Sequence, residues 1–256
     1  MEQIPGIPQS LAETENRFGS NVTINAIFIR HGEKNPKGEL TREGMNQAVA
    51  KGESLESNDV IKAESAQIAR VMNTIQAVLE SAPHDKKLNL RENTKLDFMG
   101  SANFKREYAQ RGDAAGDWFL RFGDKRPDPG TISPQEAAEL FASMVIHYEK
   151  MAPRLYSGSK IDWVHGTQQT LVESLLQRVM IREVDGEKVT GFKSIDEVGG
   201  MLGFAEGVDF KITTDKSGTP SIKVDFRTKE YDVDVQRLNA LAKTYDEKQS
   251  VTNEAK

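Results

Sequence analysis

The residues best suited to chemistry in this sequence are Arg30, His31 and Gly32, which directly follow an apolar, β-branched run at residues 24–29. Such a run predicts a buried strand, and the charged pair falls where that strand should end. In open α/β sheets, ligands gather outside the carboxyl ends of the strands. An arginine fixed beside a histidine at that place can hold an anionic oxygen while the imidazole attacks, protonates or binds it.

A second histidine occurs in the same local context. Residues 161–164 form another short apolar run, and His165, Gly166 and Thr167 follow it. A segment with helical apolar spacing begins soon afterwards, at residue 171. Because two of the chain's four histidines follow predicted strands and precede glycine, we expect both imidazoles to face one pocket.

Two imidazoles and several guanidinium groups suit phosphoryl transfer. A neutral imidazole nitrogen can attack phosphorus in line, while cations balance the charge on the equatorial oxygens. Arg70 fits this role, since it lies in the first turns of a predicted helix whose N-terminus should point at the same cleft. Each residue alone has a plainer interpretation: Arg70 as a surface arginine, His165 as a buried core histidine, Glu33 as the partner of a nearby arginine. Their joint placement favours a site.

Strands and helices alternate along most of the chain. Further strands are predicted at residues 60–65 and 87–92, and the apolar spacing at residues 68–79 predicts a helix. Thr41 is a good N-cap for the first helix, and Ser133 begins another with a capping box. This alternation predicts an α/β fold, a three-layer α/β/α sandwich with a mostly parallel central sheet.

Toward the C-terminus the pattern changes. Residues 208–212 and 222–226 alternate apolar and polar side chains around a turn-forming segment, which predicts a C-terminal β-hairpin at an edge of the same sheet or added to it. A final helix is predicted at about residues 234–243. Residues 99–132 are irregular in pattern, and we expect an insertion over the site.

Length and composition are those of a folded domain with a charged surface. We expect a flexible segment at residues 1–21, a single domain at residues 22–247 and a flexible tail at residues 248–256. The net charge of -5 and the pI near 5.6 argue against a nucleic-acid or membrane-surface binder. No apolar stretch is long enough for a membrane helix, no secretion signal is apparent, and there are no cysteines. A cytoplasmic location is the expectation.

Several motifs together resemble those of the histidine phosphatase superfamily, in its phosphoglycerate mutase-like branch. They are its RHG signature, its "LT-x-x-G-x-x-QA" helix, its "S-x-x-x-R-x-x-x-T" segment and its second histidine motif. The matching segments here are residues 29–33, 40–48, 65–74 and 165–176. The similarity covers about residues 23–180 and implies a phosphoglycerate mutase-like fold.

The resemblance also implies roles for single residues. His31 would become phosphorylated, and Arg30, Arg70 and His165 would form the phosphate pocket. The neighbours expected to bind substrate are Gly32, Glu33, Lys34, Gly166 and Thr167. A carboxylic acid would protonate the leaving oxygen: Glu92 matches the family's "L-x-E" context, and Asp97 is the alternative. No metal and no cofactor are expected.

Departures from the family pattern decide between its activities. No acidic residue follows His165 directly, unlike in the acid phosphatase branch, and Lys34 and Asn35 replace the Ser and Asn of the phosphoglycerate mutases proper. We therefore expect a metal-independent phosphomonoester hydrolase acting on a phosphorylated small molecule or phosphoprotein, as a monomer or homodimer. The alternatives are a non-catalytic phosphate- or phosphoprotein-binding module and a phosphoglycerate mutase-type phosphotransferase.

Overall fold

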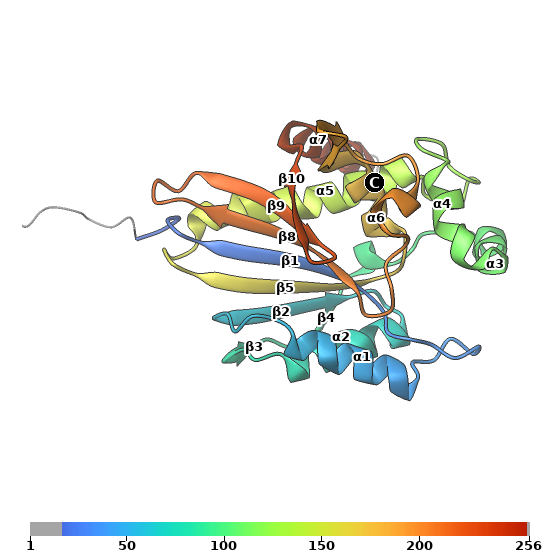
Figure 1. Ribbon diagram of the computed structural model, residues 1–256, viewed down its shortest axis with the longest axis horizontal. Helices are drawn as coiled ribbons and strands as arrows, with labels where there is room; N and C mark the ends of the chain where they lie inside the picture. Colours follow the sequence, from blue (N-terminus) through green and yellow to red (C-terminus); the bar gives the residue numbers. More distant parts are fainter. Residues whose placement is uncertain (1–16, 255–256) are drawn as a thin grey trace, which may run out of the picture.

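One ten-stranded sheet forms the centre of the molecule (Figure 1), in a computed structural model that describes residues 17–254. Its strand order is β3-β2-β5-β1-β8-β9-β10-β6-β7, with β4 also pairing with β2. Most of the N-terminal segment that was expected to be flexible lies outside the described residues. The strands are β1 (Thr23–Arg30), β2 (Val60–Ser65), β3 (Lys86–Lys87), β4 (Arg91–Glu92), β5 (Lys160–Thr167), β6 (Met180–Val184), β7 (Glu187–Thr190), β8 (Gly207–Thr214), β9 (Pro220–Phe226) and β10 (Lys229–Val233).

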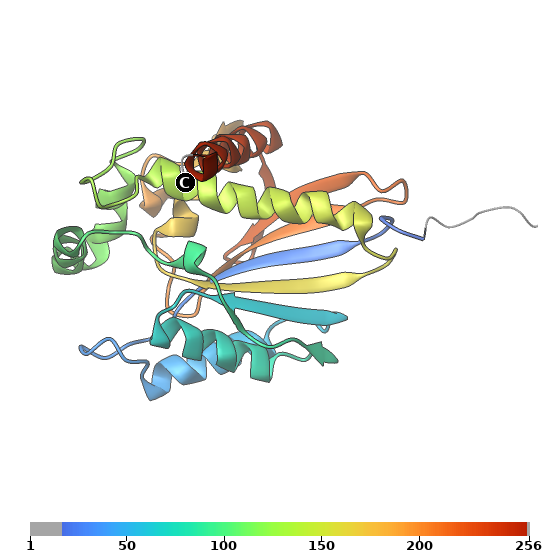
Figure 2. The ribbon, with the colours of Figure 1, turned by 180° about the vertical axis from the view of Figure 1, so that it is seen from behind.

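Helices cover both faces of this sheet, as Figures 1 and 2 show from opposite sides. The helices α1 and α2 lie together on one face, and α5, α6 and α7 lie on the other. The α-helices are α1 (Arg42–Glu53), α2 (Ala69–Ser81), α3 (Ala102–Gln110), α4 (Ala115–Leu120), α5 (Pro134–Met151), α6 (Leu171–Val179) and α7 (Val235–Glu254). Short 3-10 helices are η1 (Thr94–Leu96), η2 (Gly112–Ala114), η3 (Ala152–Arg154) and η4 (Ile195–Val198). The predicted three-layer α/β fold is therefore confirmed.

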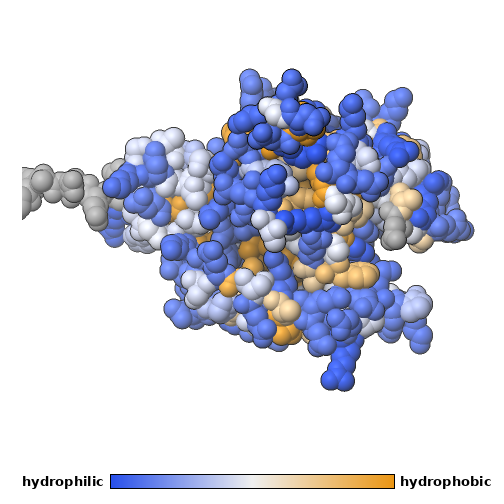
Figure 3. Space-filling model, viewed as in Figure 1, coloured by the Kyte–Doolittle hydropathy of each residue, from blue (hydrophilic) through white to orange (hydrophobic). Residues whose placement is uncertain are grey.

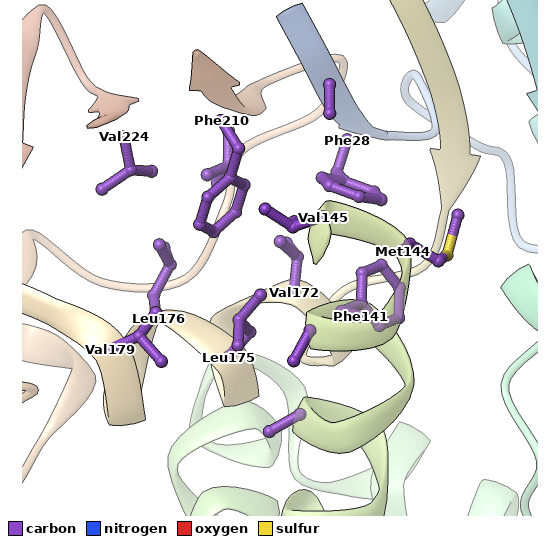
Figure 4. Close-up of a cluster of buried hydrophobic side chains, with 14 of the residues drawn as sticks. Phe28, Phe141, Met144, Val145, Val172, Leu175, Leu176, Val179, Phe210 and Val224 are labelled. Carbon is purple, nitrogen blue, oxygen red and sulfur yellow. The ribbon is translucent and has the colours of Figure 1, made fainter. Parts of the chain in front are cut away.

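Two separate hydrophobic cores follow from the alternation along β1. Phe28 packs with α5, α6, β8 and β9 in the larger core, part of which Figure 4 shows. Its neighbours Ile27 and Ile29 point the other way, toward α1 and α2. Burial on both faces explains why residues 26–29 of β1 form a continuous apolar run rather than an alternating one. The outer surface in Figure 3 is mostly hydrophilic, with apolar residues visible mainly toward the middle of that face.

Parallel strands occupy one half of the sheet and antiparallel strands the other. Strands β1, β2, β3, β4 and β5 pair in parallel. The predicted C-terminal hairpin is confirmed as β8 and β9. It does not lie at an edge: β8 pairs directly with β1, and β10, β6 and β7 extend the sheet beyond it. These last three strands, which are short and largely exposed, were not predicted from the sequence.

Three other expectations need correction. The strand expected at residues 87–92 is two separate two-residue strands, β3 and β4. The segment at residues 99–132 is not irregular, because it contains α3 and α4, joined by the stacking of Phe104 on Trp118 at 5.2 Å between ring centroids. The last helix continues to Glu254, well past residue 243. None of the helices of the described residues is long and apolar enough to cross a membrane.

Candidate functional site

His31 lies directly beyond the last residue of β1, Arg30, at the carboxyl end of the parallel strands. Arg70 is the second residue of α2, the helix that follows β2. The positive charges of Arg70, Arg30 and Lys34 all act on the His31 ring. We call Arg30, Lys34 and Arg70, which act on His31, the cationic cluster. The structure thus brings together four of the residues that the sequence placed in the site.

The backbone around His31 fixes both its position and its tautomer. The Nδ1 of His31 is 2.8 Å from the carbonyl oxygen of Gly32. A carbonyl can only accept, so Nδ1 carries the proton and donates it. The other ring nitrogen, Nε2, therefore keeps its lone pair. A neutral histidine with this tautomer presents a nucleophile or a hydrogen-bond acceptor.

Burial and positive neighbours keep His31 neutral. The residue is 4% exposed. Burial, followed by the charges of Arg70, Arg30 and Lys34, lowers its pKa to about 4, against the opposing effect of the Gly32 carbonyl. Burial, followed by Arg70 and Arg30, also lowers the pKa of Lys34. The cationic cluster thus concentrates positive charge around an uncharged imidazole.

Glycine is required after His31 because the chain passes close to α1. A side chain at Gly32 would lie 2.3 Å from the carbonyl oxygen of Gly44. The amide of Gly32 donates to the hydroxyl of Thr74 in α2 at 3.0 Å. Thr41 caps α1 by accepting from the amide of Gly44 at 2.9 Å, as predicted. These contacts join α1 and α2 to the turn that carries His31.

The guanidinium of Arg70 has a neutral hydrogen-bond acceptor, and one of its buried N–H donors is unused within the described residues. Its Nη2 donates to the side-chain oxygen of Gln168 at 3.3 Å. Its buried Nε has no hydrogen-bond partner among residues 17–254. Burial lowers the pKa of its guanidinium. An anion held in the cationic cluster would supply the acceptor that the Arg70 side chain can still use.

His165 lies elsewhere, and the prediction that both imidazoles face one pocket is wrong. Its ring is fully buried and stacks on Phe28 at 4.8 Å between centroids, inside the larger core. The Nε2 of His165 is 2.9 Å from the hydroxyl of Tyr148 in α5, and its Nδ1 is 3.7 Å from the carboxylate of Glu64. Burial lowers its pKa to about 3.

The physical reason is the register between β1 and β5. Phe28 pairs with His165, and Arg30 pairs with Thr167, so His165 is still inside the strand. If this register is continued by one residue beyond the paired strands, Gln168 comes opposite His31, and the Gln168 amide accepts a hydrogen bond from Arg70. Gln168 was not among the residues predicted for the site. The sequence signal for Gln168 was the alternation along the strand. Every second residue, His165 among them, faces α5, so Gln168 faces the side of α2 and Arg70.

Gly166 and Thr167, expected to bind substrate, are also packing residues. A side chain at Gly166 would overlap Ile75 of α2 at 2.3 Å. The hydroxyl of Thr167 is fully buried and donates to the carbonyl oxygen of Leu96 at 3.4 Å. The turn beyond them is strained, because the β-branched Thr170 has a φ of +78°. Such strain often accompanies functional turns.

The remaining predicted residues, Glu33, Glu92 and Asp97, contact the segments that flank His31 and Arg70. The amide of Glu33 donates to the side chain of Gln47 at 3.0 Å, which positions its backbone in the turn. Glu92 accepts from the side chain of Gln67 at 2.7 Å, and Asp97 accepts from the Gln67 backbone at 2.8 Å. Both carboxyls thus meet the segment that leads into α2. Glu92 is exposed, at the outer side of β2.

A buried carboxyl that was not predicted from the sequence lies near Arg30. Glu173 of α6 is fully buried and accepts from the amide of Leu202 at 3.2 Å. The carbonyl oxygen of Leu202 in turn accepts from the Arg30 guanidinium. Burial raises the pKa of Glu173 to about 7, and the opposing influences include Arg30. The peptide of Leu202 thus links this carboxyl to the cationic cluster.

Within the described residues, no group of three or more His, Cys, Asp or Glu side chains has an arrangement that could hold a metal ion.

Comparison with known proteins confirms the fold. No family model and no curated protein matches the chain. Among solved structures, a protein described as mycobacterial hydrolase 1 has a TM-score of 0.52 at 16% identity, over 81% of this chain and 99% of that one. A mycobacterial glucosyl-3-phosphoglycerate phosphatase with bound vanadate has a TM-score of 0.51 at 17% identity, over 79% and 97%. The chain therefore shares the fold of these two proteins, in agreement with the phosphoglycerate mutase-like fold that the resemblance implied.

Proposed function

We propose that this protein is a metal-independent phosphomonoester hydrolase that works through a phosphohistidine on His31. The observation that carries the proposal is the fixed tautomer of His31 among three cations. Its Nδ1 is held by Gly32, so the lone pair of Nε2 is available at neutral pH. The fold, shared with a phosphatase that binds vanadate, supports the same proposal.

The reaction follows from this geometry in two steps. The Nε2 of His31 forms a bond to phosphorus while the bond from phosphorus to the leaving oxygen breaks. Arg30, Arg70 and Lys34 balance the charge on the equatorial oxygens, and the Gln168 amide donates a hydrogen bond in place of the second imidazole. The oxygen of water then forms a bond to phosphorus while the bond between phosphorus and Nε2 breaks, and the carboxylate left by the first step takes up the proton of the water, which releases phosphate and restores neutral His31.

A carboxylic acid protonates the leaving oxygen in this proposal. Glu92 is the proposed donor and Asp97 the alternative, because both approach α2 through Gln67, three residues before Arg70. Either must come within hydrogen-bond reach of the leaving oxygen when substrate is bound. Replacing Glu92 with Gln, and separately Asp97 with Asn, should identify the donor. Removing the donor lowers turnover of an alkyl phosphate more than that of an aryl phosphate, whose leaving group needs less protonation.

One specific observation favours a second candidate, a phosphate- or phosphoprotein-binding module without turnover. Gln168 is a neutral amide that cannot gain a proton, and it lies level with His31, where a second imidazole was expected. Such a cluster can bind a phosphate group and leave it intact. The arginines would then serve recognition rather than catalysis.

The test is hydrolysis of p-nitrophenyl phosphate with and without a chelator, for the unmodified protein and His31→Ala. We expect turnover that survives the chelator and falls at least about a thousandfold in His31→Ala, because the nucleophile is lost. His147→Ala is the matched control, since His147 is an exposed histidine of α5. Binding of vanadate without turnover would establish the binding module, and full activity in His31→Ala would exclude the phosphohistidine.

A further inference from the structure

Phe204 is an exposed aromatic residue placed against the cationic cluster. Its side chain is 38% exposed, which is high for a large hydrophobic residue. The guanidinium of Arg30 lies over its ring at 4.3 Å from the centroid. The centroid of the His31 ring is 5.9 Å away. His31 is almost completely buried, and the half-exposed ring of Phe204 provides accessible aromatic surface beside it.

The loop that carries Phe204 is fixed on several sides. Arg227 donates to the carbonyl oxygens of Val198 and Met201 and forms an ion pair with Glu206 at 2.8 Å. The amide of Ala205 donates to the carbonyl oxygen of His31 at 3.2 Å. Phe204 thus does not need to be ordered when a ligand arrives. A preformed apolar surface costs a ligand less conformational entropy than a mobile one.

The position of Phe204 separates two parts of a bound ester. In the proposed site, Arg30, Arg70 and Lys34 bind the phosphate. The organic group attached to that phosphate then extends away from the cationic cluster, over the accessible surface next to it. Beside His31 that surface includes the ring of Phe204. Flat aromatic groups gain from offset stacking on such a ring, beyond the area they bury, while a polyol gains little.

Resting on the proposed function, we propose that Phe204 determines specificity, and that the site prefers phosphate monoesters whose leaving group is a planar aromatic ring. The same residue also stacks on Arg30, so a purely structural role has to be distinguished. A positioning role would change the affinity for every phosphate compound equally. A specificity role changes the ratio between aromatic and small ligands.

The test is a calorimetric comparison of phenylphosphonate with methylphosphonate, which carry the same anionic group and are not hydrolysed. We expect phenylphosphonate to bind about threefold to tenfold more tightly, the range of one aromatic stacking contact. In Phe204→Ala this preference disappears, and in Phe204→Tyr it remains. Phe18→Ala is the matched control, because Phe18 is 47% exposed and lies under Arg17 at 5.5 Å in a comparable arrangement.

The outcomes separate the two proposals. A preference that persists in Phe204→Ala, or an equal loss for both ligands, overturns the specificity role while leaving the phosphatase proposal intact. Failure of both phosphonates to bind the unmodified protein removes the anion site, and the proposed function with it.

Discussion

His31 and His165 have the same local sequence, an apolar run followed by histidine and glycine, and burial lowers the pKa of both. Their surroundings differ completely. His31 lies beyond the end of β1 among three cations, whereas His165 lies inside β5 between Phe28 and Tyr148. The register of the two strands creates this difference, because a three-residue offset turns a potential catalytic group into a core residue. A histidine motif therefore defines a site only together with its position relative to the strand end.

The largest effect expected after loss of His31 itself concerns Arg70. Arg70→Ala should weaken vanadate binding about tenfold to a hundredfold, because a hydrogen bond to a charged group contributes roughly 1.5–3 kcal/mol. Arg154→Ala is the control, since Arg154 is exposed in η3, just before β5 begins and thus at the other end of the strand. Equal affinities of Arg70→Ala and the unmodified protein would remove Arg70 from the pocket.

The next effect concerns the buried carboxyl near Arg30. The folded state raises the pKa of Glu173 to about 7, so between the ordinary value of 4.5 and pH 7 the folded protein binds more protons at this site than the unfolded chain. The free energy of unfolding therefore falls as the pH rises through this interval. Glu173→Gln should remove that part of the decline and stabilise the protein at pH 8 by about 3 kcal/mol.

Urea denaturation of both proteins at pH 5 and pH 8 measures this difference. Asp209 changes stability in the same direction, because burial raises its pKa to about 7 as well. Only the difference between Glu173→Gln and the unmodified protein therefore isolates Glu173. An identical pH dependence of the two proteins would show that the Glu173 carboxyl is ionised throughout this range.

A smaller effect is expected for Gln168, which lies at the level of His31. Gln168→Ala should weaken vanadate binding about twofold to tenfold, the range of one neutral hydrogen bond. The adjacent Gln169→Ala provides a control of identical chemistry. Gln168→His sharpens the comparison further. If the position relative to the strand end decides the role of a residue, an imidazole at position 168 should bind vanadate at least as well as the amide does. Weaker binding of vanadate in Gln168→His than in Gln168→Ala would contradict a place for residue 168 beside His31.

Local signals predicted much of the fold. Ser133 and Glu136 form the expected capping box at the start of α5, and Thr41 caps α1, because such caps depend on residues three apart in sequence. The apolar run that precedes Arg30 is part of β1, because burial on both faces favours apolar side chains at successive positions. The Asp215 to Gly218 turn and its flanking alternation gave the hairpin of β8 and β9.

The parts that were not predicted depend on contacts between distant segments. The pairing of Arg30 with Thr167 sets which residue lies beside His31, and no single strand contains that information. The ion pair between Arg227 and Glu206 holds the loop in which Phe204 lies against Arg30. The sequence around Arg30 and His31 gives no indication that this distant loop contacts them.

The smallest effect on activity is expected for the second histidine. Replacing His165 and Tyr148 together with Phe removes their polar contact and keeps an aromatic ring against Phe28. Turnover and vanadate affinity should stay within about threefold of the unmodified protein, because His165 does not face the cationic cluster. The burial that lowers the pKa of His165 to about 3 also makes the unfolded chain bind more protons below the ordinary value of 6.5. The wild-type protein therefore loses stability as the pH falls through this interval, and the double variant should lose less between pH 7.5 and pH 5. A large loss of turnover with unchanged stability would show instead that both histidines act at one site.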